Sequence, residues 1–261
     1  MRSNNVLGFI FAATLDDKIP ELASSRTTAS VPIGGKYRII DFDLSNMSNS
    51  GISNVGIVAK SNFQSLMDHV GSGSAYDLSK RRSNLSILPP YDGKAFSSFV
   101  ETIYNMHGYI EHCREEYVLI SQGNVITNID YTDVFDFHSK KKADITLIYK
   151  KHAIPQGYDR PITLDVDNDG KVNQIFVKPG VVDKGVFNHA YGSILIKKDL
   201  LMSEIRNAIS VNQLDVRRLI QSSLGKYSIY AYENKGYCAA ISSINDYFEF
   251  NMDLNEKRSK G

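Results

Sequence analysis

Hydrophobic and polar positions follow two alternating patterns along the first 150 residues. Continuous apolar runs predict four buried strands, at 6–13, 54–59, 117–121 and 144–150. Apolar residues at helical spacing predict helices at 38–50, 63–70, 97–115 and 131–139. Gly51 is expected to end the first of these helices. Strands that alternate with helices imply right-handed crossovers and a mainly parallel sheet.

The pattern changes after residue 150. Segments 162–166 and 171–176 alternate apolar and polar residues around the turn Asn168-Asp169-Gly170, which predicts a hairpin. Further strands are expected at 191–196, 228–232 and 239–241, and helices at 215–224 and 243–252, with 256–261 frayed. The run from Asp165 to Gly170 also matches the opening of a calcium loop. Phe176 occupies the twelfth position, where such a loop needs glutamate, so the hairpin is the preferred interpretation.

Charge and composition exclude several function classes. The 261 residues include 30 basic and 29 acidic side chains, so no strong field attracts nucleic acid or a membrane surface. The first apolar run has only about eight residues, too few to span a membrane, and it lacks the layout of a signal peptide. With two cysteines, Cys113 and Cys238, we expect reduced thiols and a cytoplasmic protein.

One segment carries a specific resemblance. Residues 31–42 read V-P-I-G-G-K-Y-R-I-I-D-F, followed by L-S-N at 44–46 and N-S-G-I at 49–52. This segment closely resembles the glucose-1-phosphate adenylyltransferases of glycogen and starch synthesis. Weaker matches are Y-V-L-I-S at 117–121 with Asp130-Tyr131, F-V-K-P at 176–179, and the segment 246–254. The resemblance therefore extends over almost the whole chain.

The resemblance implies a fold and a domain organisation. The family has an α/β, Rossmann-like nucleotidyltransferase domain of the glycosyltransferase-A-like type, with a mixed, mainly parallel sheet flanked by helices. We expect this domain at 1–254, followed by a frayed tail at 255–261. The family's second domain, a left-handed β-helix, is expected to be absent from this chain.

The loop after the first strand departs from the family pattern G-G-x-G-x-R-L. Counted back from Val31 without gaps, the three glycines fall on Ala13, Thr14 and Asp16. The loop arginine falls on Lys18, and the lysine of the R-x-K-P pattern falls on Thr28. Asp16 and Asp17 would each repel a phosphate group by ~1 kcal/mol in water at 4 Å, and by more at a lower dielectric. We therefore expect that this loop does not hold ATP.

Both metal positions of the family also differ. The aspartate of its S-G-D pattern falls on Asn124, and the carboxylate of its D-V-G-T pattern falls on Ala240. Since Mg²⁺ prefers carboxylate oxygens, neither an amide nor a methyl group replaces these ligands well. The resemblance thus implies no intact catalytic residue, no metal site and no cofactor.

Parts of the substrate pocket are retained by the same comparison. Lys178 matches the lysine that contacts the glucose phosphate, although Val177 replaces the glutamate before it. Gly123, Glu101 and Tyr104 are the other expected remnants of this pocket. A sugar phosphate is therefore an expected effector.

The retained family segments together with the substituted catalytic and metal positions resemble the GlgD-type regulatory subunit of the family. It implies a non-catalytic or weakly catalytic subunit in glycogen biosynthesis, which pairs with a catalytic glucose-1-phosphate adenylyltransferase in a hetero-oligomer. The alternative is an active enzyme that makes ADP-glucose from ATP and glucose 1-phosphate, with Mg²⁺ held by other carboxylates such as Asp16 or Asp130. A third hypothesis is a sensor that only binds sugar phosphates around Lys178.

Overall fold

The computed structural model describes residues 3–12, 19–59, 62–79, 84–89, 98–153, 161–177 and 185–259. The chain divides into two compact units, and each combines segments that are distant in sequence. One unit comprises Gly8–Gly93, Ser121–Asp130 and Gly236–Gly261, and we call it the β1 unit. The other comprises Met1–Leu7, Lys94–Ile120 and Tyr131–Lys235, and we call it the β11 unit.

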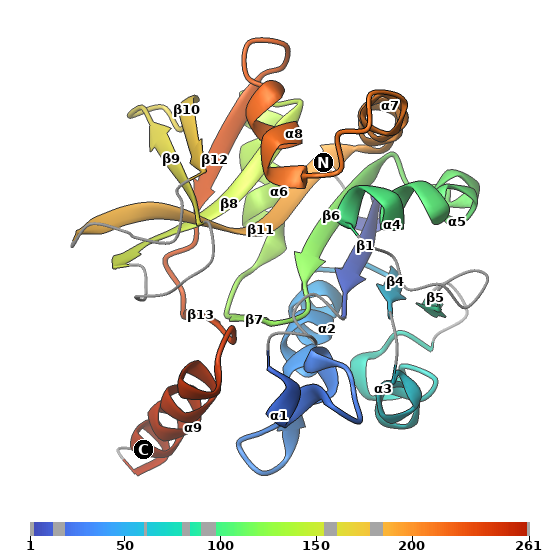
Figure 1. The fold of residues 1–261 in the computed structure, drawn as a ribbon, viewed down its shortest axis with the longest axis vertical. Coiled ribbons are helices and arrows are strands. Elements are labelled where there is room, and N and C mark those ends of the chain that lie inside the picture. The colour runs from blue at the N-terminus through green and yellow to red at the C-terminus, as the bar shows by residue number, and fades with distance from the viewer. Residues whose placement is uncertain are drawn as a thin grey trace. The chain divides into compact units, whose positions relative to one another are not determined.

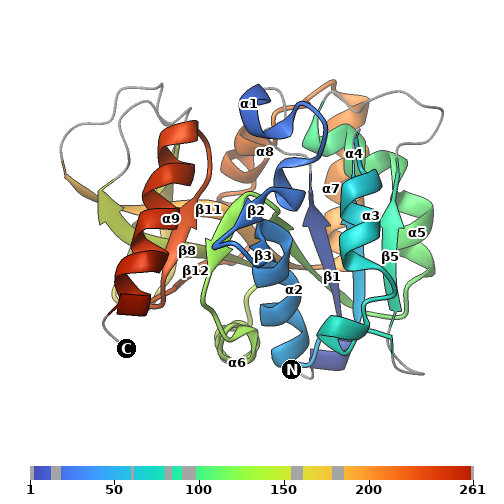
Figure 2. The same cartoon turned by 90° about the horizontal axis from the view of Figure 1, so that it is seen from below.

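The β1 unit is built on the buried strand β1 and its neighbours β4 and β5. In chain order its elements are β1 (Val6–Phe11), α1 (Pro20–Ala23), η2 (Thr28–Ser30), β2 (Pro32–Ile33), β3 (Tyr37–Arg38), α2 (Ile39–Asn49), β4 (Asn54–Val58), α3 (Gln64–Val70), η3 (Ser74–Tyr76), β5 (Asn84–Leu88), β7 (Val125–Thr127), β13 (Cys238–Ala240) and α9 (Ile244–Ser259). The helix α9, which is drawn in red in Figure 2, packs against β13. One core cluster, which includes Val31, Ile39, Ile126, Ile241 and Phe250, joins these late elements to the early ones.

The β11 unit is organised around its longest strand (Figure 1). Its elements are η1 (Ser3–Asn5), α4 (Phe99–Asn105), α5 (His107–His112), β6 (Tyr117–Gln122), α6 (Tyr131–Lys141), β8 (Ile145–Ala153), β9 (Ile162–Val166), β10 (Val172–Val177), β11 (Val186–Lys197), α7 (Lys198–Ser210), α8 (Val216–Ser222) and β12 (Ile229–Glu233). β11 pairs antiparallel with β6 on one edge and β8 on the other, so that Ile194 lies opposite both Ile120 and Leu147. β12 adds to β8 in parallel.

Several sequence expectations are confirmed. The helix expected at 38–50 is α2, and Gly51 follows it with a φ of 79°, a left-handed conformation that suits glycine. The expected hairpin is the antiparallel pair β9 and β10. At its turn, the Asp167 carboxylate accepts hydrogen bonds from the backbone N–H groups of Asp169 and Lys171. This carboxylate therefore closes a turn, as the hairpin interpretation requires.

Three expectations are corrected. The single helix expected at 97–115 is two helices, α4 and α5, which meet at Met106 with Gly108 shortly after the break. The segment 71–94, in which the sequence pattern predicted no strand or helix, contains a strand, β5, which pairs in parallel with β4 although its side chains are only half-buried. Finally, α9 continues to Ser259, so part of the expected frayed tail has a helical backbone.

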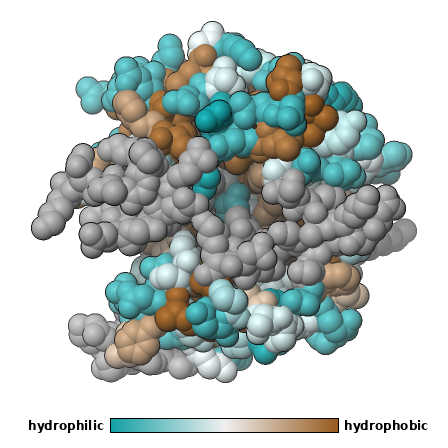
Figure 3. Space-filling view, viewed as in Figure 1, coloured by the Kyte–Doolittle hydropathy of each residue, from teal (hydrophilic) through white to brown (hydrophobic). Residues whose placement is uncertain are grey.

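Surface character agrees with the balanced charge. On the face in Figure 3, hydrophobic residues form small groups among hydrophilic ones wherever side chains are described. Among the described residues, no helix combines the length and the apolar character that a membrane crossing requires.

Candidate functional site

The loop after β1 is the first part of the site that the family pattern identifies. Lys18 and the two aspartates at 16 and 17 lie outside the described residues, and so does Lys178. The loop's two ends are described. Ala12 follows β1, and its carbonyl accepts a hydrogen bond of 3.2 Å from the N–H of Ala29 in η2. Residues 12 and 29 therefore converge at the end of β1, beside the predicted position Thr28.

Thr28, to which the resemblance assigns the family's lysine position, is fully buried. The η2 turn around it is closed by its neighbours, because Ser30 Oγ donates to the Thr27 carbonyl at 2.9 Å. Thr27 Oγ1 also donates to Ser30 Oγ at 3.2 Å. A short polar side chain therefore packs here within a hydroxyl-rich turn, where the family places a long cation.

Gly123 lies against the end of β1. Its N–H donates to the Phe11 carbonyl at 2.7 Å. A Cβ atom at this position would lie 2.6 Å from Phe11 O and 3.0 Å from Ala12 Cα, so only glycine fits. The predicted remnant Gly123 thus joins β1 to the turn before β7 through direct backbone contact.

The structure brings together the two positions that the resemblance assigns to metal ligands. β7 and β13 are antiparallel, and Ala240 is opposite Val125, the residue after Asn124. The Ile241 N–H donates to the Asn124 carbonyl at 2.8 Å. In return, the buried side-chain amide of Asn124 donates to the Ile241 carbonyl at 3.3 Å. The Asn124 amide therefore also links the two strands.

This donor set does not fit Mg²⁺. The ion prefers carboxylate oxygens and waters in octahedral geometry, whereas the paired positions offer one amide and one methyl group. Asp130, a ligand in the alternative hypothesis, is exposed after β7, and Ser50 Oγ donates to it at 3.3 Å. Within the described ranges, no three or more His, Cys, Asp or Glu side chains are grouped so that they could hold a metal ion.

Glu101 and Tyr104 belong to α4 in the β11 unit. Ser98 caps this helix by accepting from the Glu101 N–H at 3.1 Å, and its hydroxyl contacts Glu101 Oε2 at 3.4 Å. Tyr104 is 40% exposed and stacks on His107. In the structure Glu101 therefore bonds to the residue that caps α4, and Tyr104 packs on the helix surface against His107. Their part in a substrate pocket stays a prediction.

Sequence reasoning missed a buried acid next to the site. Asp43 of α2 is 1% exposed, and Ser121 near the end of β6 donates to its Oδ1 at 2.6 Å. The other oxygen, Oδ2, has no hydrogen-bond partner among the described residues. Burial raises the pKa of Asp43 to about 7, and the Ser121 hydrogen bond offsets part of that rise. The available signal was an aspartate four residues after Ile39, on the apolar face of a predicted helix.

A second cluster on α2 also went unrecognised. Asp41 Oδ1 lies 2.6 Å from His69 Nε2, and it accepts a 2.5 Å hydrogen bond from the Tyr76 hydroxyl. Its Oδ2 caps the helix by accepting from the Arg38 N–H. Arg38 in turn donates to the Ser65 hydroxyl at 2.6 Å. This cluster joins α2, α3 and η3. Among the described residues, no Ser or Cys side chain is hydrogen-bonded to Asp41 or His69, so the pair has no adjacent nucleophile.

Comparisons with known proteins agree with this geometry. A family model described as nucleotidyl transferase matches residues 17–256. The glucose-1-phosphate adenylyltransferase of Clostridium acetobutylicum is 31% identical over 97% of this chain and 68% of its own length. The protein of the same name from Bacillus subtilis is 30% identical over 97% and 68%. A solved structure of a putative glucose-1-phosphate thymidylyltransferase from Bacillus anthracis, in complex with a sucrose, has a TM-score of 0.76 at 12% identity. It covers 95% of this chain and 94% of its own, which confirms the expected fold class.

Proposed function

Because this chain belongs to the glucose-1-phosphate adenylyltransferase family of nucleotidyl transferases, we propose that it is a regulatory subunit that does not itself transfer adenylyl groups. It would pair with a catalytic member of the family and alter that partner's activity in glycogen biosynthesis. The observation that carries the proposal is the pairing of Asn124 with the strand that holds Ala240. A metal-dependent enzyme would need carboxylates at such a place.

The electrostatic reason is direct. In nucleotidyl transfer, charge develops on the phosphates, and bound cations stabilise it. At Asn124 and Ala240 the side chains supply no negative charge to hold such a cation, and Asp16 and Asp17 in the loop after β1 would repel the phosphates. Each change weakens the binding of metal-ATP, and together they support a subunit that has lost catalysis while keeping the fold.

Regulation would take the form of a coupling free energy between subunits. A partner that binds two states of a catalytic subunit unequally shifts the population toward the state it prefers. Couplings of this kind are typically about 1–3 kcal/mol, which corresponds to changes of roughly 5- to 150-fold. The regulatory proposal therefore predicts a change in the catalytic subunit's activity on mixing.

The test compares three samples under one set of conditions. ADP-glucose formation from ATP and glucose 1-phosphate is measured with Mg²⁺ for this chain alone, for a catalytic family member alone, and for their mixture. We expect no turnover by this chain alone and, in the mixture, a several-fold change relative to the catalytic subunit alone. Co-elution of the two chains from a sizing column would show that they assemble.

The second candidate is an active adenylyltransferase, which is favoured by the names of relatives at about 30% identity. This candidate predicts turnover that rises in proportion to the concentration of this chain and is lost in Asn124→Ala. Such a result would overturn the regulatory proposal. A sugar-phosphate sensor would instead give a calorimetric signal with glucose 1-phosphate that Lys178→Ala removes.

A further inference from the structure

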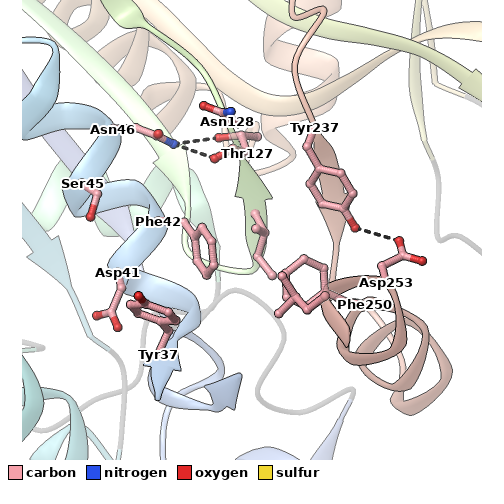
Figure 4. A pocket seen from close by; sticks show the side chains of 12 residues that line it. Tyr37, Asp41, Phe42, Ser45, Asn46, Thr127, Asn128, Tyr237, Phe250 and Asp253 are labelled. Carbon is pink, nitrogen blue, oxygen red and sulfur yellow. Dashed lines mark hydrogen bonds between the residues drawn. The ribbon is translucent and has the colours of Figure 1, made fainter. Parts of the chain in front are cut away.

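A cavity of about 370 Å³ lies in the β1 unit, and its lining includes neither Asn124 nor Ala240 (Figure 4). Four aromatic rings line it, from Tyr37, Phe42, Tyr237 and Phe250. The rings form a continuous series: Tyr37 and Phe42 are 6.3 Å apart between centroids, Phe42 and Phe250 are 6.2 Å apart, and Tyr237 and Phe250 are 5.8 Å apart. We call this space the aromatic cavity. Its volume is within the range of small-molecule sites.

The charges at the aromatic cavity have one sign. Asp41 and Asp253 are among the lining residues, and no Lys, Arg or His is found among the described residues that line it. The Asp41 carboxylate is already engaged by Arg38, His69 and Tyr76. Asp253 is different, because it is exposed on α9, where its Oδ2 accepts one hydrogen bond of 3.2 Å, from the Tyr237 hydroxyl. The α9 side of the cavity therefore presents an accessible carboxylate beside aromatic rings.

Aromatic faces combined with a carboxylate favour one ligand chemistry. The face of an aromatic ring carries a negative quadrupole and attracts cations, and a carboxylate adds a charge-assisted hydrogen bond. One ring of the series already shows this behaviour, since Lys36 Nζ lies 5.9 Å from the centroid of Tyr37. Phosphates and carboxylates would be repelled by Asp253 and would find no cation among the described lining.

We propose that the aromatic cavity binds a small organic cation in which an apolar body carries a primary ammonium group. The ammonium group donates to Asp253, and the apolar body packs among Phe42, Phe250 and Tyr237. This assignment does not depend on the regulatory proposal, because it uses no residue of the β7 and β13 site.

The position of the cavity gives such binding a structural consequence. Its walls come from α2, β7, the residue before β13 and α9. Two of these elements are already joined, because the Asn46 side chain of α2 donates to the Thr127 carbonyl of β7 at 2.8 Å. A ligand between these elements would bind the folded state only, so it would raise the melting temperature of the chain. β7, which lines the cavity with Ile126 and Thr127, begins one residue after Asn124, so the cavity wall and the candidate site share one segment of chain.

The test uses two probes of similar size and opposite charge, phenethylamine and 3-phenylpropionate. Binding to the full chain is measured by calorimetry and by the shift in melting temperature. We expect phenethylamine to bind about tenfold more tightly than 3-phenylpropionate, because it gains both the ring and the carboxylate contacts. Equal affinities, binding of neither probe, or preference for the carboxylate would overturn the proposal.

A matched pair of variants assigns the preference to this cavity. Asp253→Asn removes the charge of an exposed residue, and we expect most of the tenfold preference to disappear. Asp136→Asn removes an equally exposed carboxylate on α6 and is expected to leave the preference unchanged. Circular dichroism establishes that both variants are folded. A cation preference that survives Asp253→Asn would place the binding elsewhere and end the proposal.

Discussion

Two regions of the β1 unit differ in the charge of their polar side chains. At the β7 and β13 pair, Asn124 and Ala240 are neutral, and the Asn124 amide bonds to main chain. On α2, two carboxylates lie within three residues of each other. Asp41 is bound by His69, Tyr76 and the backbone of Arg38, while Asp43 is buried beside Ser121. The strand pair holds the two positions that the resemblance assigns to metal ligands, and their side chains carry no charge, whereas the helix carries acidic side chains without a grouping of ligands. Family membership therefore identifies the position of a site, and the side chains at that position decide its chemistry.

The largest expected effect comes from returning carboxylates to the strand pair. The double variant Asn124→Asp with Ala240→Asp returns a carboxylate to each position that the resemblance assigns to a metal ligand, and divalent cations of this kind prefer carboxylate oxygens. We expect Mn²⁺ binding, measured by electron paramagnetic resonance, to tighten at least about tenfold relative to the unchanged chain.

A second Asn→Asp substitution provides the control for this experiment. Asn128→Asp replaces Asn124→Asp in the control double variant, and it adds the same charge beyond the end of β7 that is far from position 240. This second double variant should show no such gain. Equal metal affinity in the two folded variants would mean that the Asn124 and Ala240 positions do not form a common site.

The sequence predicts these two regions unequally, and the reason is distance along the chain. Local signals were sufficient for α2, for Gly51 after it and for the β9–β10 hairpin, because each depends on residues a few positions apart. The family pattern placed Asn124 and Ala240, which are distant in sequence, at positions that prove to be adjacent. The contact between Asp43 and Ser121 joins residues 78 positions apart, and no periodicity encodes such a pair.

The remaining differences also have physical causes. β5 was missed because its segment is polar overall and its strand is only half-buried, so the usual alternation is weak. The aromatic cavity is lined by α2, β7 and α9. The sequence pattern of each element predicts which of its faces is apolar, but it does not predict whether the apolar faces leave a space between them. The chemistry of a cavity therefore becomes visible only when the elements are assembled.

The second effect concerns the charge on α2. Burial raises the pKa of Asp43 from the ordinary carboxyl value of 3.8 to about 7, so the folded state holds its proton more tightly. Stability is therefore expected to fall as pH rises from about 4 to 7 and then to level off. Asp43→Asn stays neutral and can still accept from Ser121, so it should stabilise the chain by about 4 kcal/mol at pH 8 and by much less at pH 4.

Urea unfolding of the two chains at both pH values measures this difference. Asp136→Asn is again the control, because an exposed carboxylate on α6 should change the unfolding free energy little at either pH. If Asp43→Asn has the same stability relative to the parent at pH 4 as at pH 8, folding does not raise the pKa of Asp43, and the acid is as ionised in the folded chain as in the unfolded one. The cost of burying a charge on α2 would then be absent from the comparison with the neutral strand pair.

The smallest effect belongs to the hydroxyl that binds Asp41. Tyr76→Phe removes the hydrogen bond to Asp41 Oδ1 while leaving His69 and the Arg38 N–H on the carboxylate, so we expect a loss of about 1 kcal/mol at pH 7. Burial, reinforced by Asp41, raises the pKa of Tyr76 above its ordinary value of 10.0. The hydroxyl's contribution is thus complete below pH 10 and is lost as pH rises beyond it, so the two unfolding free energies should converge at higher pH. A constant difference through pH 11 would show that the Tyr76 hydroxyl titrates alike in the folded and unfolded chains, so its hydrogen bond to Asp41 would not account for the loss.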